Sequence, residues 1–345
     1  MSERRLDPTT GEWVTFATHR QDRTFLPPAG ACPLCPASVS GAEVSETGDV
    51  PFDVAVFDNR FPSMQPDPPE PDLVATALMP VLPATGRCEV VVYSADHGTT
   101  LARAGYDTAR TVIDVWADRW RVLGAEGHNY VMPFENKGEV IGVTLNHPHG
   151  QVYAFPEVPP RPLRELRVAA THRHRTGRCI DCDVVADEIT DGRRVVVLGT
   201  HWLVHVPFWA RFPYEVRISP REHHADLAVL TVTQRDELAH VLSRVLRALD
   251  ELFEMSMPYV MGVFSQPTGG DPSVAGWSGT WEQICHLHLV ISPPHRTATK
   301  IKYLAGSELM AGAFVTDVAP EQAATRLREA MNHVARSHHD AAATP

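Results

Sequence analysis

Residues 147–151 read His-Pro-His-Gly-Gln, which places three side chains capable of chemistry at phosphorus on alternate positions. Alternate residues of a strand point to the same face, so we expect His147, His149 and Gln151 to face one site. His149 can act as a nucleophile if a backbone carbonyl holds its other ring N–H. The Gln151 amide can donate to a phosphate oxygen in the transition state, and Gly150 leaves the backbone beside the nucleophile uncrowded. Histidines that merely pack on a half-buried strand are the competing interpretation.

Two Cys-x-x-Cys pairs occur in a chain that has 18 histidines, which favours metal binding over disulfides. Cys32, Cys35, His97 and His147 form a Cys2His2 set suited to tetrahedral zinc, and four protein ligands make such a zinc structural. His147 would then hold its strand in place through the metal. A reduced cysteine pair without metal is the alternative.

The order of elements repeats along the chain, and this repeat predicts the fold. A strand over 86–97, a helix capped by Asp107 and extended segments over 128–134 and 139–145 follow the first cysteine pair. The same order follows the second pair, with a helix capped by Thr233, a loop over 265–281 and a connector that begins at 156–163. The corresponding strands are 214–224, 258–264 and 284–292.

We therefore expect an α+β fold that contains two copies of one unit, with antiparallel sheets flanked by helices. The predicted halves are residues 1–160 and residues 161–345. By the same repeat, a second metal site is expected at Cys179, Cys182, His223 and His286.

Composition narrows the function classes. The chain has 345 residues, 43% of them hydrophobic, and a formal net charge of -11 without runs of Lys or Arg. This argues against a nucleic-acid surface, although a local group of donors could still bind a small phosphorylated ligand. No apolar run is long enough to span a bilayer, and the first residues lack the apolar core of a signal peptide. We expect a cytoplasmic protein without a membrane partner.

The chain resembles the galactose-1-phosphate uridylyltransferase family, a duplicated member of the histidine triad superfamily. The resemblance covers nearly the whole chain, with gaps mainly in 160–195 and 265–281. The motif HPHGQ together with FENKG is its most specific part. The matching segments are HRQDR (19–23), CPLC (32–35), FDNRFP (57–62), GRCEVVVYSADH (86–97), FENKGEVIG (134–142), HPHGQ (147–151), HWLVHVPFWARFPYEVRISPREH (201–223) and HLHLVISPP (286–294).

The resemblance implies a reaction in galactose metabolism, through the Leloir pathway. His149 would attack the α-phosphorus of UDP-glucose and release glucose 1-phosphate. Galactose 1-phosphate would then attack uridylyl-His149, which gives ping-pong kinetics. The substrates would thus be a UDP-sugar and a sugar 1-phosphate. The resemblance assigns phosphate contacts to Asn136, Thr144 and Gln151, a nucleoside contact to Asn59, and phosphate binding to Arg20 and Arg23, for which a solvated basic turn is the alternative.

The resemblance also implies a homodimer, because in the family a segment near the C-terminus of the partner subunit completes the sugar pocket. Residues 301–314 match that segment, with Lys302, Tyr303 and Glu308 at family positions. Glu308 would accept hydrogen bonds from sugar hydroxyls, unless it is only a surface carboxylate.

Three positions depart from the family pattern. Arg60 replaces an acidic residue found in some members, and Phe314 replaces a glutamine that contacts the sugar. The alternative functions are therefore a related nucleoside-diphosphate-sugar phosphorylase or hydrolase, or a uridylyltransferase for a different sugar 1-phosphate. A nucleotide-binding regulatory protein with an inactive site is a rival from another class.

The third departure concerns the second metal. Some members bind it, as zinc or iron, through a glutamate and three histidines. Glu165, His286 and His288 match three of those ligands, but the fourth falls on Phe264. We therefore favour the cysteine set for this site. His288 takes the place of His149 in the second copy, and Val290 replaces the glutamine, so the second half is expected to be catalytically silent.

Overall fold

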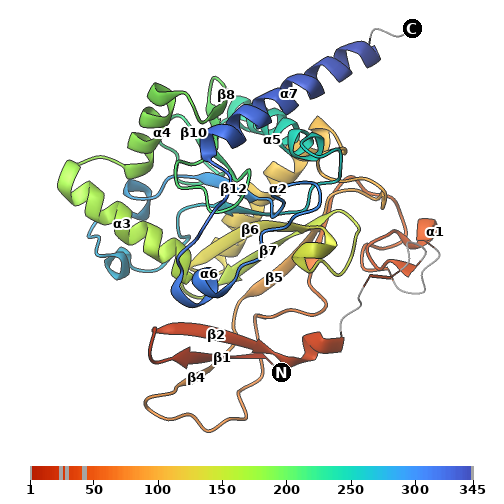
Figure 1. The fold of residues 1–345 in the computed structure, drawn as a ribbon. Coiled ribbons are helices and arrows are strands. Elements are labelled where there is room, and N and C mark those ends of the chain that lie inside the picture. Colours follow the sequence, from red (N-terminus) through yellow and green to blue (C-terminus); the bar gives the residue numbers. More distant parts are fainter. Residues whose placement is uncertain (1, 23–25, 28–30, 41–44, 343–345) are drawn as a thin grey trace.

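The structure is a computed structural model that describes residues 2–22, 26–27, 31–40 and 45–342. Its centre is a nine-stranded antiparallel sheet (Figure 1). In spatial order the strands are β3 (Ala55–Asp58), β5 (Arg87–Val92), β7 (His149–Phe155), β6 (Tyr130–Lys137), β11 (Tyr259–Phe264), β12 (His288–Ser292), β10 (Val216–Pro220), β9 (Trp202–His205) and β8 (Val195–Leu198).

The sheet confirms the repeated α+β unit. In the first half, β5, the helix α2 (Tyr106–Ala125), β6 and β7 give the spatial order β5-β7-β6. In the second half, β10, the helix α5 (Val232–Glu251), β11 and β12 give the order β10-β12-β11. The two units share one continuous sheet, because β6 pairs with β11 across the middle.

The two faces of the sheet have different neighbours. The helices α2 and α5 pack on one face, and α7 (Pro320–Ala342) packs on α5. Each large apolar side chain buried in this layer stabilises the fold by about 1.5–3 kcal/mol. The strand residues that pack with these helices include Val91, Val131, Val152, Ala154, Trp202, Val204, Ile218, Met261, Leu289 and Ile291.

On β7 the buried residues alternate with partly exposed ones. Val152 and Ala154 belong to the core under the helices. His149, Gln151 and Tyr153 therefore point to the opposite face, as the two-residue period of a strand requires. This alternation separates the site from the main core.

Smaller elements surround the sheet. A three-stranded sheet of β2 (Glu12–Ala17), β1 (Ser2–Asp7) and β4 (Val81–Pro83) lies at the bottom of Figure 1. The remaining helices of the described chain are η1 (Thr18–Asp22), α1 (Ala37–Ser40), η3 (Glu139–Ile141), α3 (Pro160–Thr176), α4 (Ile180–Asp191), η4 (Pro272–Ala275), η5 (Trp281–Gln283) and α6 (Gly306–Ala311). Within the described ranges, no helix is both long and apolar enough to cross a membrane.

The predicted strand over 139–145 is wrong. That segment forms the short 3-10 helix η3 between Gly138 and Gly142, whose φ angles are 97° and 84°. Only glycine adopts such angles without strain, so these two residues bend the chain away from the sheet. A Cβ atom on Gly138 would also lie 2.7 Å from the side chain of Pro258.

Both predicted helix caps are displaced. α2 begins at Tyr106 after Gly105, so Asp107 lies in the first turn and not at the cap. α5 is capped by Thr231 and not by Thr233, because the Thr231 hydroxyl accepts from the backbone N–H of Gln234. The predicted loop over 265–281 contains the short helix η4 and the first residue of η5.

Candidate active site

His149 is the first residue of β7, and its tautomer follows from one hydrogen bond. Nδ1 lies 2.7 Å from the carbonyl oxygen of His147, so Nδ1–H donates to that oxygen. Nε2 makes no hydrogen bond to the described residues and carries the free lone pair. Burial lowers the pKa of His149 below its ordinary value, which favours the neutral ring that a nucleophile needs.

Gln151 lies two residues further along β7, with its amide oriented by a neighbour. The Asn59 Nδ2 atom donates to Oε1 of Gln151 at 3.2 Å. Asn59 is held in turn by the backbone N–H of Phe61, which donates to its Oδ1 at 2.8 Å. The Gln151 carbonyl oxygen is therefore engaged, and its NH2 group remains available to a ligand.

A cleft with an empty volume of about 600 Å3 opens over these side chains. Four residues singled out in the sequence for substrate binding line it together with His149: Arg20, Asn59, Thr144 and Gln151. Arg20 donates to the hydroxyl of Tyr153 at 3.2 Å. The structure thus brings together residues from segments more than 100 positions apart.

Asn136 lies on the other side of His149. It lines a smaller neighbouring cavity, to which both His147 and His149 also contribute. His149 therefore borders both hollows, and Asn136 is positioned to contact a group that lies beyond the nucleophile. Arg23 falls outside the described residues.

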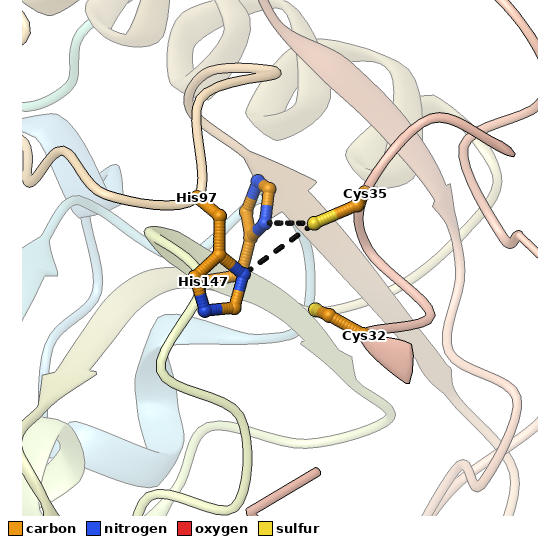
Figure 2. A group of neighbouring side chains, drawn as sticks. All are labelled: Cys32, Cys35, His97 and His147. Carbon is orange, nitrogen blue, oxygen red and sulfur yellow. Dashed lines mark hydrogen bonds between the residues drawn. The ribbon is translucent and has the colours of Figure 1, made fainter. Parts of the chain in front are cut away.

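The expectation that His147 shares a face with His149 and Gln151 is wrong. The strand begins only at His149, so the alternation does not extend back to His147. The His147 ring points toward Cys35 instead (Figure 2), with Nδ1 3.3 Å from the sulfur.

The four predicted ligands of the first metal site lie together. All of the ligand atoms of Cys32, Cys35, His97 and His147 lie within 4.8 Å of one another (Figure 2). Cys35 Sγ is 3.4 Å from Nδ1 of His97, close to the edge of about 3.5 Å expected for a tetrahedron with Zn–S and Zn–N bonds. His147 Nε2–H donates to the Ser94 carbonyl at 2.7 Å, which leaves Nδ1 as the ligand atom. The residues fit zinc.

The second cluster has the same form. Cys179, Cys182, His223 and His286 also lie with their ligand atoms within 4.8 Å of one another. Cys182 Sγ is 3.5 Å from Nδ1 of both histidines. His286 Nε2 faces the Pro220 carbonyl at 3.1 Å, as His147 faces that of Ser94.

The alternative ligand set of the second half is incomplete in space as well as in sequence. Glu165 lies 3.8 Å from Nε2 of His288. The ring of Phe264 stacks on His288 with centroids 4.8 Å apart, where a fourth ligand would otherwise approach. His286 faces the cysteines and not this group.

Lys302 and Glu308 are not brought to the cleft within the described chain. They form an ion pair with each other at 2.9 Å, and Lys302 also donates to the carbonyl of Val315. Hydrogen bonding to Lys302 lowers the pKa of Glu308 to about 2, so it stays ionised.

Some residues in the cleft or in contact with it were not foreseen from the sequence. Tyr153 does not line the cleft, but it accepts a hydrogen bond from the cleft residue Arg20. It continues the alternation of His149 and Gln151, so the strand pattern could have identified it. Glu46, Phe61 and Leu34 also line the cleft. Burial raises the pKa of Glu46, and Arg60 opposes that effect. No local motif marks Glu46.

Comparisons with known proteins match nearly the whole chain to one family. The family model "Galactose-1-phosphate uridyl transferase, N-terminal domain" matches residues 1–159, and the corresponding "C-terminal domain" model matches residues 165–343. The galactose-1-phosphate uridylyltransferase of Thermotoga maritima is 35% identical over 332 residues, which cover 95% of this chain and 98% of that protein. The enzyme of Streptomyces lividans is 37% identical over 339 residues, covering 95% and 87%.

Solved structures with the same fold include a uridylyltransferase. A structure described as "Structure of uridylyltransferase" has a TM-score of 0.83 and 33% identity, and covers 96% of this chain and 99% of its own. An ADP-glucose phosphorylase from Arabidopsis thaliana shares the fold, with a TM-score of 0.70 and 21% identity over 95% of this chain and 98% of its own.

Proposed function

Since the chain belongs to the galactose-1-phosphate uridylyltransferase family, which exchanges UMP between UDP-glucose and galactose 1-phosphate in galactose metabolism, we propose that His149 carries the uridylyl group in a ping-pong mechanism. One observation carries this proposal. The Nδ1–H of His149 is bound to a backbone carbonyl, and the ring with its free Nε2 borders the cleft beside Gln151.

The reaction has two in-line displacements. In the first, the Nε2 lone pair attacks the α-phosphorus of UDP-glucose, and the bond from phosphorus to the glucose 1-phosphate oxygen breaks. In the second, a phosphate oxygen of galactose 1-phosphate attacks the same phosphorus, and the P–N bond breaks to return neutral His149. The Gln151 NH2 group donates to the non-bridging oxygen on which charge builds up in both transition states.

The other cleft residues bind and orient the substrates. Thr144 supplies a hydroxyl to the phosphates and Arg20 a positive charge, while Asn59 holds Gln151 and contacts the nucleoside. Asn136, on the far side of His149, contacts the phosphate that enters or leaves. Arg23 belongs to the same proposed phosphate-binding group.

Zinc has a structural role in this proposal. Cys32, Cys35, His97 and His147 would hold one ion with no open position, and it would fix the residue two places before the nucleophile. A second zinc, or an iron, would occupy the equivalent set in the second half. That half, residues 161–345, has Val290 in place of the glutamine and acts as a silent scaffold for residues 1–160.

We further propose a cytoplasmic homodimer in which Lys302 and Glu308 serve the partner's cleft. Large apolar side chains of this segment are exposed in the single chain, which supports burial against a second copy. Met310 is 84% exposed and Leu309 62%. Glu308 would exchange its bond with Lys302 for sugar hydroxyls.

One observation favours a related alternative. Arg60 lines the cleft beside Asn59, where some family members have an acidic residue. A changed charge at this position would suit a different sugar 1-phosphate, or inorganic phosphate in a phosphorylase reaction. Product analysis with a panel of sugar 1-phosphates and with inorganic phosphate distinguishes these reactions, since only a phosphorylase forms a nucleoside diphosphate.

Steady-state kinetics test the ping-pong mechanism. We expect parallel double-reciprocal lines when UDP-glucose is varied at several galactose 1-phosphate concentrations. The enzyme should also exchange labelled glucose 1-phosphate into UDP-glucose without any acceptor. Intersecting lines together with no exchange would show a direct transfer in a ternary complex.

A further inference from the structure

A second cleft lies in the second half of the molecule, between α3, α4 and the sheet. Its empty volume is about 940 Å3, larger than that of the cleft at His149. His288 lies at its inner end, with Arg217 and Val290 beside it. The proposed transfer reaction makes no use of this space.

The pairing of the strands shows that this cleft is the second copy of the first. Gln151 pairs with Val90, which pairs with Phe57 on the next strand. In the second half Val290 pairs with Arg217, which pairs with His205. His288 and Val290 therefore take the positions of His149 and Gln151.

The equivalence continues into the loops that follow β3 and β9. Two and four residues beyond Phe57 lie Asn59 and Phe61, which line the first cleft. Two and four residues beyond His205 lie Pro207 and Trp209, which line the second. The duplication has kept the aromatic wall and the His-x-His strand, and has lost the amides that orient a reacting phosphate.

His288 has an unused polar atom in this cleft. The residue is 5% exposed, and its Nδ1–H donates to the carbonyl of His286 at 2.9 Å. Nε2 is buried without a hydrogen-bond partner in the described chain, and the nearest carboxylate oxygen, on Glu165, is 3.8 Å away. A buried acceptor without a partner costs stability, which a donor on a bound ligand would relieve.

The acidic residues that line the cleft bind other groups, so two of its arginines have no carboxylate partner in the described chain. Asp181 pairs with Arg217, and Glu165 pairs with Arg161. Glu215 is held by the backbone N–H groups of residues 211 and 212, each at 3.1 Å. In the described parts of the chain, Arg164 and Arg211 form no ion pair. They are suited to an anion, because guanidinium groups bind phosphate through paired hydrogen bonds.

We propose that this cleft binds a nucleoside monophosphate without transferring it. Arg164 and Arg211 hold the phosphate, the exposed face of Trp209 packs against the base, and a ligand hydroxyl donates to Nε2 of His288. Trp209 is 41% exposed, so its ring is open to such a contact. This inference does not depend on the route of catalysis at His149.

Calorimetric titration with UMP tests the proposal on the full chain. We expect an UMP site that Arg164→Ala weakens about tenfold or more, as the loss of a charge-assisted hydrogen bond predicts. Arg175→Ala is the matched control, because it removes another exposed arginine from the same helix, outside the cleft. The rate of uridylyl transfer should be unchanged in both variants.

Trp209→Ala provides a second variant, which should weaken the same site. Two UMP sites in the wild type, one of them sensitive to both substitutions, support the proposal. A single site sensitive to both also supports it, even if the cleft at His149 fails to bind UMP. Binding that neither substitution alters would overturn it. Inorganic phosphate that binds the Arg164-sensitive site as tightly as UMP would also overturn the assignment to a nucleotide.

Discussion

Two hydrogen bonds decide which atoms of His149 and Gln151 are available to a substrate. The Nδ1–H group of His149 donates to the His147 carbonyl, and the Asn59 amide donates to Oε1 of Gln151. What remains is one lone pair and one NH2 group, two residues apart on the same strand face. These are the two functions that a displacement at phosphorus needs.

Gln151→Glu tests the donor at the residue scale, because it keeps the size of the side chain and replaces the NH2 group by an oxygen. We expect kcat to fall about 10²- to 10³-fold, as for the loss of one transition-state donor, with a smaller change in KM for UDP-glucose. Gln322→Glu makes the same charge change on the exposed face of α7 and should leave kcat unaltered. If kcat fell less than threefold in Gln151→Glu, the Gln151 NH2 group would not be a donor in the transition state.

At the scale of elements, the strand β6 holds one buried carboxyl group, that of Glu135. Glu135 is 3% exposed, and burial raises its pKa to about 8, with Lys137 opposing the effect. The raised pKa means that the folded state holds a proton between about pH 4.5 and 8 that the unfolded chain releases. Stability should therefore fall as the pH rises through this range.

Glu135→Gln removes that titration. We expect the free energy of unfolding, measured with urea at pH 5 and pH 8, to decline less with pH in the variant than in the wild type. The exposed Glu139→Gln serves as the control and should keep the wild-type slope. Equal slopes in all three proteins would show that Glu135 is not protonated in the folded state.

The repeated unit could be predicted because its elements leave local signals in the sequence. Residues 90–92 are a β-branched run typical of a strand, and the apolar residues of α5 recur at helical spacing. The first Cys/His set was predicted from its Cys-x-x-Cys pair, two histidines and the family resemblance, and the second from the repeat; the structure brings each set together. The η3 helix was missed because two glycines with positive φ interrupt an apolar run. The β6–β11 pairing and Glu46 were missed because contacts between distant segments leave no local signal.

The candidate metal sites also belong to the element scale. The first joins the loop before α1 to the residues just before β7, and the second joins the start of α4 to the residues just before β12. We expect two zinc ions per chain by elemental analysis, one of which is lost in Cys32→Ser and the other in Cys179→Ser. Both variants should melt at lower temperature, because the ligands stabilise the fold only with the ion. Cys88→Ser removes a buried cysteine outside both clusters and should retain both ions. If Cys32→Ser or Cys179→Ser kept both ions, the cysteine replaced in that variant would not be a metal ligand.

At the scale of the molecule, the continuous sheet makes the second half a support for the first. Asn136 lies on β6, which is hydrogen-bonded to β11 of the second unit, and pairs there with Val260. The second half thus fixes one wall beside His149. In the proposed dimer, the exposed apolar side chains of the segment 303–315 would pack against a second copy of the chain.

Dimer formation through this segment can be measured by sedimentation velocity. We expect the wild type to sediment as a dimer and the double variant Leu309→Asp, Met310→Asp to shift to monomer with reduced transfer activity, because buried carboxylates oppose association. Val232→Asp alters an equally exposed apolar residue at the start of α5 and should remain dimeric. A double variant that stays dimeric would place the interface elsewhere.

Intact-mass analysis after incubation with UDP-glucose, without any sugar phosphate acceptor, tests the central claim most directly. We predict that the wild type gains the mass of one uridylyl group, that His149→Ala gains none, and that His288→Ala, which alters the equivalent histidine of the second copy, still gains it. Addition of galactose 1-phosphate should remove the group. Turnover by a wild type that never carries the added mass, or an adduct that persists in His149→Ala, would contradict the account.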